Sequence, residues 1–320
     1  MKNQSKRVCL VGCGRISARH IEALKAAENI QLASVCDCDS ACAKACGTAN
    51  NVPWYTDIKA LKGMDVISIL TPSGLHPRHV IEAAEYCDAP LIVCEKPLSL
   101  TVRETVEMYR SVKKNNKKLL PVFQNRYNPL IQFIKKMLEQ ETLGTVYQFN
   151  CNVFWNRNDE YFNIDWHGSA DLDGGVLFTQ ASHYVDMLHY LFGEVCEYKG
   201  LGGNLRGFPV QDTVSAVLKF KDGVVGALNA TVCVYRTNYC TEFTVIGSKG
   251  TVRLSGTNLN KIEFWDVEGK EKPALDFTLD HQYGKGHDIM YGYVAAEDWS
   301  KFPDYDDVLS GISLMEKLSF

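Results

Sequence analysis

The sequence lacks long hydrophobic runs, a strong charge of either sign, and internal repeats. No stretch approaches the ~18 uninterrupted apolar residues of a membrane-spanning helix, so we expect no membrane segment. The 34 basic and 38 acidic residues leave a net charge of −4, which gives no reason to expect nucleic acid or an anionic membrane as a partner. What remains is an ordinary globular composition, 46% hydrophobic and 22% charged, over 320 residues. At ~150 residues per domain, this length predicts two domains.

Cysteine is abundant, with twelve residues, but the regular spacing of a disulfide scaffold is missing. The only early apolar stretch, residues 8–14, is too short for a secretory signal, so we expect a reduced, cytoplasmic protein. Cys38, Cys42 and Cys46 recur every four residues, which would place three thiols on one face of a helix. Because no histidine or second cysteine pair supplies a fourth ligand, the sequence predicts no metal site.

Residues 1–125 alternate short apolar runs with amphipathic helical patterns. The runs rich in Val, Ile and Leu occupy residues 7–11, 30–36, 65–70, 91–94 and 119–123. Continuous apolar strands that alternate with helices indicate βαβ units and a parallel sheet covered on both faces. We therefore predict an α/β fold in which residues 1–125 form an N-terminal Rossmann domain with a doubly wound parallel sheet.

Residues 126–320 follow a different pattern. Candidate strands occupy residues 145–154, 214–220, 224–234, 242–246, 251–254 and 261–265. A hairpin turn at Lys221-Asp222-Gly223 joins two of them, and one helical pattern, residues 175–192, interrupts the series. The sequence therefore predicts a C-terminal α+β domain over residues 126–320, with a large, open, mostly antiparallel sheet that serves substrate binding and oligomerisation.

A glycine loop follows the first predicted strand. Gly12 and Gly14, with the adjoining Arg15 and Ile16, would bring backbone N–H groups close to a pyrophosphate at the N-terminus of the next helix. The second predicted strand ends at Asp37, whose carboxylate would accept hydrogen bonds from the adenosine ribose and repel a 2′-phosphate. These features together predict bound NAD rather than NADP. A nucleotide-free fold with a fortuitous glycine pair is the alternative.

Two later strand ends carry polar residues. Thr71-Pro72-Ser73 and His76 follow one apolar run, and Glu95-Lys96-Pro97 follows the next. Because ligands bind at the carboxyl edge of open α/β sheets, both segments are predicted to line the cofactor site. A lone lysine after a strand is usually a solvated surface charge. Lys96, however, lies between an apolar run and a proline, which favours a functional role.

The ordered set of these motifs resembles the glucose–fructose oxidoreductase, inositol dehydrogenase and rhizopine-catabolism (Gfo/Idh/MocA) family. The resemblance rests on the glycine loop, the two strand-end segments, and Gly174-Gly175 followed by His183-Tyr-Val-Asp186. It implies a Rossmann domain paired with an α/β domain whose open sheet mediates homodimers or homotetramers, and hydride transfer between nicotinamide and a sugar or polyol. It also implies that Lys96 and His183 face the reacting hydroxyl and that Gln124 and Trp166 contact the cofactor.

The chemistry of alcohol oxidation is compatible with these two roles. The hydroxyl oxygen must lose its proton while the carbon that bears it loses a hydride. A neutral His183 is a suitable general base for this proton near pH ~7. Lys96 would hydrogen bond the oxygen and stabilise its developing negative charge. A structural core histidine is the alternative for His183. Which of the two groups takes the proton stays open.

One departure from the family bears on this mechanism. Many members carry an aspartate four residues before the catalytic histidine, one helical turn away on the same face. This sequence has Thr179 at that position, followed by Gln180. Without the carboxylate, an imidazolium at position 183 loses its ion-pair partner, so the inositol type of mechanism is disfavoured.

Further segments resemble one branch of the family, which oxidises UDP-N-acetylglucosaminuronate at C3 on the route to bacterial surface polysaccharides. They are residues 123–129, 166–175 and 260–265, and Gly286-His287 with Tyr291. That substrate carries about three negative charges, which a chain of net charge −4 must meet with local cations. The substrate-binding candidates are Lys96, Arg126, Tyr127, Arg157, Thr179, Gln180, His183, Arg236, Asn238 and Tyr239.

Two other functions stay open at this point. A dehydrogenase of a free sugar or inositol is favoured if the arginines point to solvent. A catalytically silent sensor that uses bound dinucleotide to regulate a partner is a third class, although it would need neither Lys96 nor His183. Fold alone does not decide among them.

Overall fold

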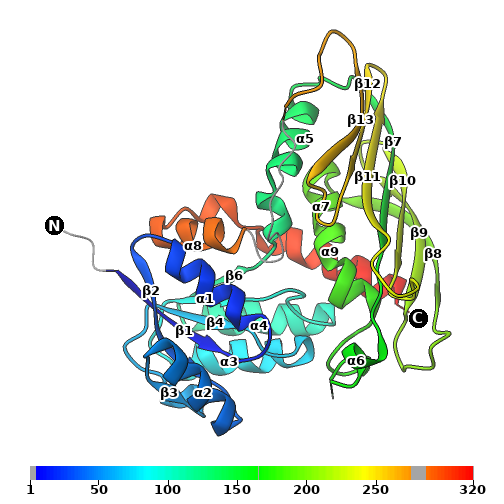
Figure 1. The fold of residues 1–320 in the computed structure, drawn as a ribbon. Helices are drawn as coiled ribbons and strands as arrows, with labels where there is room; N and C mark the ends of the chain where they lie inside the picture. The colour runs from blue at the N-terminus through cyan, green and yellow to red at the C-terminus, as the bar shows by residue number, and fades with distance from the viewer. Residues whose placement is uncertain (1–4, 165, 275–285, 320) are drawn as a thin grey trace. The chain divides into compact units, whose positions relative to one another are not determined.

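The computed structural model describes residues 5–164, 166–274 and 286–319. The chain forms two compact units, each built on one sheet (Figure 1). One unit comprises residues 1–124 and 284–312, and the other comprises residues 125–283 and 313–320. Of the helices in the described ranges, none combines the length and the apolar character that a bilayer span requires.

The first unit contains a six-stranded parallel sheet with the strand order β3-β2-β1-β4-β5-β6. The strands are β1 (Lys6–Val11), β2 (Ile30–Cys36), β3 (Trp54–Tyr55), β4 (Val66–Ile69), β5 (Leu91–Cys94) and β6 (Lys118–Pro121). β4 and β5 are buried along their whole length, as expected where helices cover both faces of a parallel sheet. The order changes direction between β1 and β4, which is the point where doubly wound sheets bind nucleotides. The predicted Rossmann sheet is confirmed.

Local signals start the helices of this unit where the sequence turns from strand to helix. The Asp39 carboxylate accepts hydrogen bonds from two backbone N–H groups at the start of α2, and Thr101 forms a capping box with Glu104 at the start of α4. The helices between strands are α1 (Ser17–Ala26), α2 (Ser40–Asn50), α3 (His76–Tyr86) and α4 (Val102–Lys114).

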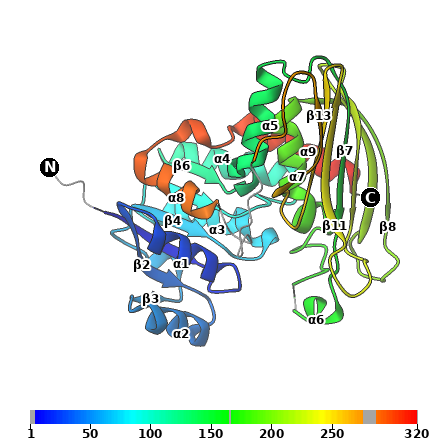
Figure 2. The same ribbon diagram turned by 45° about the horizontal axis from the view of Figure 1, so that its top comes forward.

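The first unit also takes in a segment from the far end of the chain. The predicted second domain took in all of residues 126–320, whereas residues 284–312 belong to the first unit. The reason is that α8 (His287–Ala296) packs against α1, as Figure 2 shows. It also hydrogen bonds through His287 to Glu95, directly after β5, and through Tyr291 to Ser68 of β4. The division between the units then falls within α9 (Tyr305–Leu318).

The second unit contains a seven-stranded sheet with the order β13-β12-β11-β7-β10-β9-β8. All its pairs are antiparallel except β7 with β10, so the predicted mostly antiparallel sheet is confirmed. The strands are β7 (Val146–Phe154), β8 (Val195–Gly203), β9 (Thr213–Phe220), β10 (Val225–Thr231), β11 (Cys240–Gly247), β12 (Gly250–Ser255) and β13 (Lys261–Val267).

One face of this sheet is covered and the other is open. Along β9, residues 214, 216, 218 and 220 are buried while the residues between them are mostly exposed, which is the alternation of a half-covered strand. The buried face packs against α5 (Pro129–Glu139) and α7 (Ser182–Phe192), whereas α6 (Asp159–Phe162) is a single short turn (Figure 2).

Two strands were not predicted. β3 has only two residues at one edge of its sheet. β8 is the edge strand of the second sheet, and no residue of its sequence is fully buried. Strand prediction relies on apolar residues recurring with a period of two, and an edge strand exposed on both faces has no such pattern.

Candidate active site

The glycine loop lies at the carboxyl end of β1. Gly12 has φ +104°, and a Cβ there would lie 2.9 Å from the backbone carbonyl group of Leu70 at the end of β4, so only glycine fits. At Gly14, by contrast, a Cβ would meet nothing within 4 Å among the described residues, and Gly14 and Arg15 are exposed. No described side chain caps the N-terminus of α1. This end of the helix is therefore shaped to receive a pyrophosphate.

Asp37 is placed to complete a dinucleotide site. Its Oδ2 accepts a hydrogen bond of 2.8 Å from the backbone N–H of Cys13 in the loop, and its Oδ1 accepts one of 2.9 Å from the N–H of Asp39. Each carboxylate oxygen has room for a second donor, so the adenosine ribose hydroxyls fit the remaining acceptor sites. The side chain is only half-buried and open to a ligand.

The loop after β4 is fixed by histidines. Thr71 Oγ1 lies 2.9 Å from His79 Nδ1, and the ring of His76, which is 1% exposed, lies between two carbonyl groups. His76 Nδ1 is 2.7 Å from the oxygen of Pro97, and Nε2 is 2.7 Å from the oxygen of Thr71. The ring thus joins the loop after β4 to the loop after β5. Burial lowers the pKa of His76. Ser73, 4% exposed, and the half-buried Pro72 belong to the same edge of the sheet.

Glu95 and Lys96 follow β5 directly. Glu95 is 5% exposed, and its Oε2 accepts a hydrogen bond of 3.1 Å from the backbone N–H of Lys96. Lys96 is half-buried. The structure therefore holds the lysine backbone in place at the sheet edge that the sequence singled out, which is the edge of the glycine loop and Asp37.

In the second unit, His183 lies in the first turn of α7 and is 8% exposed. A π-helical turn, Leu177–Ala181, precedes it, so the predicted helix of residues 175–192 has an irregular start. π-turns inside helices occur often at functional sites. Because a π-turn contains one more residue than an α-helical turn, Thr179 and His183 are not stacked one helical turn apart on the same face, as their spacing in the sequence suggested.

A buried carboxylate lies beside Thr179, and sequence reasoning missed it. Asp173 is 2% exposed, and its Oδ1 accepts hydrogen bonds from the backbone N–H of Gly175 (2.8 Å) and from Thr179 Oγ1 (3.3 Å), while its Oδ2 accepts one from Gly168 (3.0 Å). Burial raises the pKa of Asp173 despite these hydrogen bonds. The acid that position 179 lacks is thus present nearby, in the loop before the helix.

Three predicted substrate residues form one cluster. Arg157 donates to Gln180 Oε1 from Nε (3.1 Å) and Nη2 (2.6 Å), and its Nη1 lies 3.4 Å from Asn238 Oδ1. The guanidinium also lies against the rings of Trp155 and Tyr161, at 5.0 and 5.4 Å. Gln180 donates to Tyr161 Oη at 2.8 Å, so this tyrosine belongs to the cluster although no sequence signal marked it. Gln180 follows Thr179 in the π-turn and thereby ties the cluster to the start of α7.

Arg126 forms an ion pair within the second unit. It is 6% exposed and pairs with the buried Asp186 of α7, with Nη2 2.8 Å from Oδ1 and Nε 2.9 Å from Oδ2. The aspartate neutralises this cation inside the unit, and both side chains lie away from solvent. The charge of Arg126 is thus already paired within the unit, and Tyr127 beside it is buried as well. The predicted substrate contacts of both residues stay predictions.

The remaining candidates lie near the surface. Arg236 is exposed, with φ +62°, and its guanidinium lies 4.8 Å from the ring of Tyr235 in the turn before β11. Tyr239 is 76% exposed in that turn. Gln124, the last residue before the division of the units, and Trp166, in the second unit, are half-buried. Their predicted contacts with the cofactor stay predictions.

Protein-family models match both halves of the chain. Residues 6–123 match the model of the oxidoreductase family with an NAD-binding Rossmann fold, and residues 131–253 match the GFO/IDH/MocA C-terminal domain. The chain belongs to the GFO/IDH/MocA oxidoreductase family. The resemblance noted in the sequence is thereby confirmed, and the glycine loop and Asp37 belong to the NAD-binding half of a family member.

Solved structures resemble this family member over nearly its whole length. The WlbA dehydrogenase from Bordetella pertussis, in complex with NADH and UDP-GlcNAcA, is 31% identical with a TM-score of 0.91, covering 99% of this chain and 95% of that one. The WlbA enzyme from Chromobacterium violaceum, in complex with the same two molecules, is 32% identical with a TM-score of 0.87, covering 100% and 97%. Levoglucosan dehydrogenase from Pseudarthrobacter phenanthrenivorans is 29% identical over 277 residues, 78% of this chain and 67% of that protein. The chain is an NAD-dependent dehydrogenase.

Proposed function

We propose that this dehydrogenase oxidises the C3 hydroxyl of a nucleotide-linked sugar acid of the UDP-N-acetylglucosaminuronate type, in the synthesis of surface-polysaccharide precursors. The observation that carries the proposal is the likeness, at 31% identity over 99% of the chain, to a WlbA dehydrogenase whose structure contains NADH and UDP-GlcNAcA. Bound NAD would supply the hydride acceptor.

Two side chains would act on the reacting hydroxyl. His183 is an imidazole at the start of α7, next to the π-turn, and would take the hydroxyl proton. Lys96, held by its backbone at the end of β5, would donate a hydrogen bond to the same oxygen and stabilise its growing negative charge.

Two arginines would bind the negatively charged groups of the sugar nucleotide. Arg157 is oriented by Gln180 and Asn238 and keeps a half-buried guanidinium, which is suited to a carboxylate or a phosphate. Arg236 is exposed in a turn close in sequence to Asn238 and would add a second cation. The proposal thus assigns the substrate charge to these two arginines and not to Arg126.

A dehydrogenase of a free sugar is the second candidate. The likeness to levoglucosan dehydrogenase favours it, and so does the ion pair of Arg126 with Asp186, which removes one of the three expected cations. Such an enzyme would turn over without a nucleotide on its substrate.

NADH formation by the purified protein separates the two candidates. We expect NADH absorbance to rise with NAD and UDP-N-acetylglucosaminuronate and to stay at baseline with levoglucosan, myo-inositol or the free uronate. Arg157→Leu should raise KM for the sugar nucleotide by at least ~10-fold, because a hydrogen bond to a charged group contributes about 1.5–3 kcal/mol to binding. Faster turnover of an uncharged sugar would favour the second candidate.

Variants of the two acting residues test the mechanism. Lys96→Met and His183→Asn should each lower turnover by at least ~10²-fold while NADH still binds, because their interactions are made mainly in the transition state. His189→Asn, six residues along the same helix α7, is the matched control and should retain activity. Full turnover by Lys96→Met would return Lys96 to the class of surface charges.

A further inference from the structure

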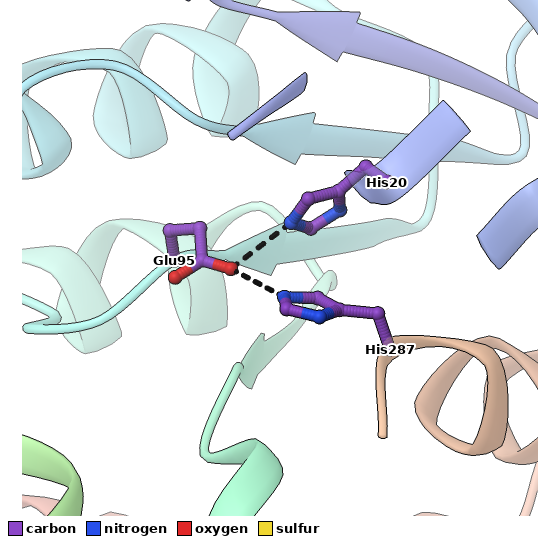
Figure 3. A group of neighbouring side chains, drawn as sticks. All are labelled: His20, Glu95 and His287. Carbon is purple, nitrogen blue, oxygen red and sulfur yellow. Dashed lines mark hydrogen bonds and ion pairs between the residues drawn. The ribbon is translucent and has the colours of Figure 1, made fainter. Parts of the chain in front are cut away.

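A buried hydrogen-bond network in the first unit joins α1, the end of β5 and α8 (Figure 3). His20 Nε2 lies 3.0 Å and His287 Nε2 lies 2.8 Å from the same carboxylate oxygen, Glu95 Oε1. Tyr291 Oη lies 2.8 Å from His20 Nδ1 and 3.0 Å from Ser68 Oγ on β4. Glu95 is 5% exposed and the other four residues are 0% exposed, so the network is closed to solvent.

The protons of this network have one consistent arrangement. Burial opposes the charge of Glu95, but the hydrogen bonds from His20 and His287 outweigh it and hold the pKa of Glu95 well below its usual range. Burial and the neighbouring His287 lower the pKa of His20 to about 4. Glu95 is thus an ionised acceptor and His20 is neutral, with its proton on Nε2. Tyr291 then donates to His20 Nδ1 and accepts from Ser68.

The same three side chains have the donor types of a metal site, since two imidazoles and a carboxylate lie within 4.8 Å of one another. The distances favour hydrogen bonds. Both histidine Nε2 atoms approach one carboxylate oxygen at 2.8–3.0 Å, and a proton on each nitrogen explains these contacts fully. A structural zinc site takes four protein ligands, and the described His, Cys, Asp and Glu residues add none to these three.

We propose that the network is a positioning device for Lys96, with His287 and Tyr291 of α8 as positioning residues for hydride transfer. Two histidines fix Glu95 Oε1, which leaves Oε2 to hold the backbone N–H of Lys96 at 3.1 Å. On the other side, His76 lies against the carbonyl group of Pro97. The backbone around Lys96 is therefore restrained from both directions, as a preorganised catalytic group requires.

In this proposal α8 supports the catalytic lysine. This helix lies outside both residue ranges that match the family models, 6–123 and 131–253. The proposal rests on the proposed function in that Lys96 must act on the substrate. His287 and Tyr291 would act only through Glu95, so their loss should lower kcat without weakening the binding of either substrate.

Steady-state kinetics and NADH titration of four variants test the proposal, with UDP-N-acetylglucosaminuronate as substrate. His287→Leu removes one donor to Glu95 and should lower kcat at least ~10-fold, with KM for the sugar and Kd for NADH within ~3-fold of wild type. Tyr291→Phe is nearly isosteric and should lower kcat ~3-fold or more, because His20 loses the donor that fixes its tautomer. His287→Gln places an amide N–H near the position of Nε2 and should recover most of the kcat lost in His287→Leu.

Val294→Ala is the matched control, since Val294 is fully buried in the same helix α8 and takes no part in the network. It should lower the melting temperature yet leave kcat within ~2-fold of wild type. An equal loss of kcat in Val294→Ala and His287→Leu would mean that helix stability alone matters, and would overturn the proposal. If His287→Leu does not fold, Tyr291→Phe decides alone.

Lys96→Met, assayed in parallel, separates the two levels of inference. If Lys96→Met is inactive while the network variants keep full kcat, the positioning role is wrong and the proposed function stands. If Lys96→Met keeps full kcat, the catalytic role of Lys96 fails and the positioning role with it. Elemental analysis of the purified protein should find no stoichiometric metal. If the wild type instead holds one equivalent of metal that His287→Leu lacks, the three side chains form a metal site, and the hydrogen-bonded network proposed here is wrong.

Discussion

At the residue scale, we expect the carboxylate of Asp37 to select between NAD and NADP. The Asp37 carboxylate accepts hydrogen bonds from the backbone N–H of Cys13 in the glycine loop and from that of Asp39 in the following turn. These two contacts fix the carboxylate in the absence of a ligand. A fixed anion next to the ribose favours two hydroxyl groups over a phosphate, because like charges within ~4–5 Å in a partly desolvated site cost a few kcal/mol.

We expect the protein to bind NADH at least ~10²-fold more tightly than NADPH, in keeping with that cost. Asp37→Asn keeps the shape of the side chain and one acceptor oxygen but removes the charge. It should bind NADPH more tightly, so that the ratio of the two dissociation constants falls by ~10-fold or more. Fluorescence titration of both dinucleotides measures the ratio. Equal affinities in the wild type would contradict the role of Asp37.

A second prediction concerns the acid that the family carries four residues before its histidine. Restoring it by Thr179→Asp would place a carboxylate where Thr179 now donates to Asp173, so a half-buried acid would lie against a buried one. We expect the unfolding free energy to fall by about 2 kcal/mol, because one of the acids must stay protonated or both must share a desolvated site. Thr179→Asn is the neutral control, and chemical denaturation of both variants gives the comparison. If Thr179→Asp and Thr179→Asn are equally stable, the side chain at position 179 does not lie against Asp173.

At the scale of elements, the first unit depends on a helix from the end of the chain. α8 contributes His287 and Tyr291 to a network whose other members come from α1, β4 and β5, so the sheet edge at Lys96 is complete only after α8 has docked. The π-turn before α7 acts in a similar way in the second unit, where it presents Thr179 to Asp173 and Gln180 to Arg157.

The buried network predicts a stability that depends on pH. His20 takes a proton near pH 6.5 in the unfolded chain but only near about 4 in the folded protein, so between these values the unfolded state binds more protons. Stability is therefore full above pH 6.5 and falls as the pH drops toward 4, by up to about 3 kcal/mol from this group. The lowered pKa of Glu95 acts with the same sign at still lower pH.

Urea unfolding between pH 4 and 7 measures this slope. His20→Gln cannot take up the proton and should have a shallower slope over the same range, although it is less stable at neutral pH. An equally steep slope in the variant would assign the acid sensitivity to other groups.

At the scale of the whole molecule, the second sheet leaves apolar side chains on its open face. Leu201 of β8, Val217 of β9 and Val225 of β10 are 81%, 53% and 39% exposed, and their registers place them on the same side as Ser215 and Ala227. Among the described residues no helix covers this side (Figures 1 and 2). An open sheet face with exposed branched side chains is typical of a surface that a second copy covers.

We expect the protein to form a homodimer or homotetramer through this face. Val217→Asp places a charge in the middle of the face and should shift the protein toward monomers by at least ~10-fold in dissociation constant, since a buried unpaired charge opposes association. Leu205→Asp is the control, because Leu205 is 97% exposed in the turn after β8. Sedimentation velocity distinguishes the species, and a wild-type monomer would refute the expectation.

The sequence by itself determined the features that depend on neighbouring residues. Continuous apolar runs predicted β1, β2, β4, β5 and β6 within one or two residues, and alternation predicted most of the second sheet. The glycine loop was recognisable because φ +104° at Gly12 is a local requirement that only glycine meets readily. Asp37 and Lys96 were recognisable because each lies within two residues of a strand's carboxyl end, and the ends of parallel strands meet at one edge of the sheet.

Only the tertiary structure decided which charges were already paired. Arg126 and Asp186 lie 60 residues apart, and nothing in the local pattern of either shows that they neutralise each other. The same holds for Asp173 beside Thr179, and for α8, whose partners on α1 and β5 lie more than 190 residues earlier. Backbone conformation follows from adjacent residues, whereas the state of a polar side chain depends on whatever the fold brings to it. The sequence could therefore name candidates for the site, but it could not show which of them were already paired with another side chain.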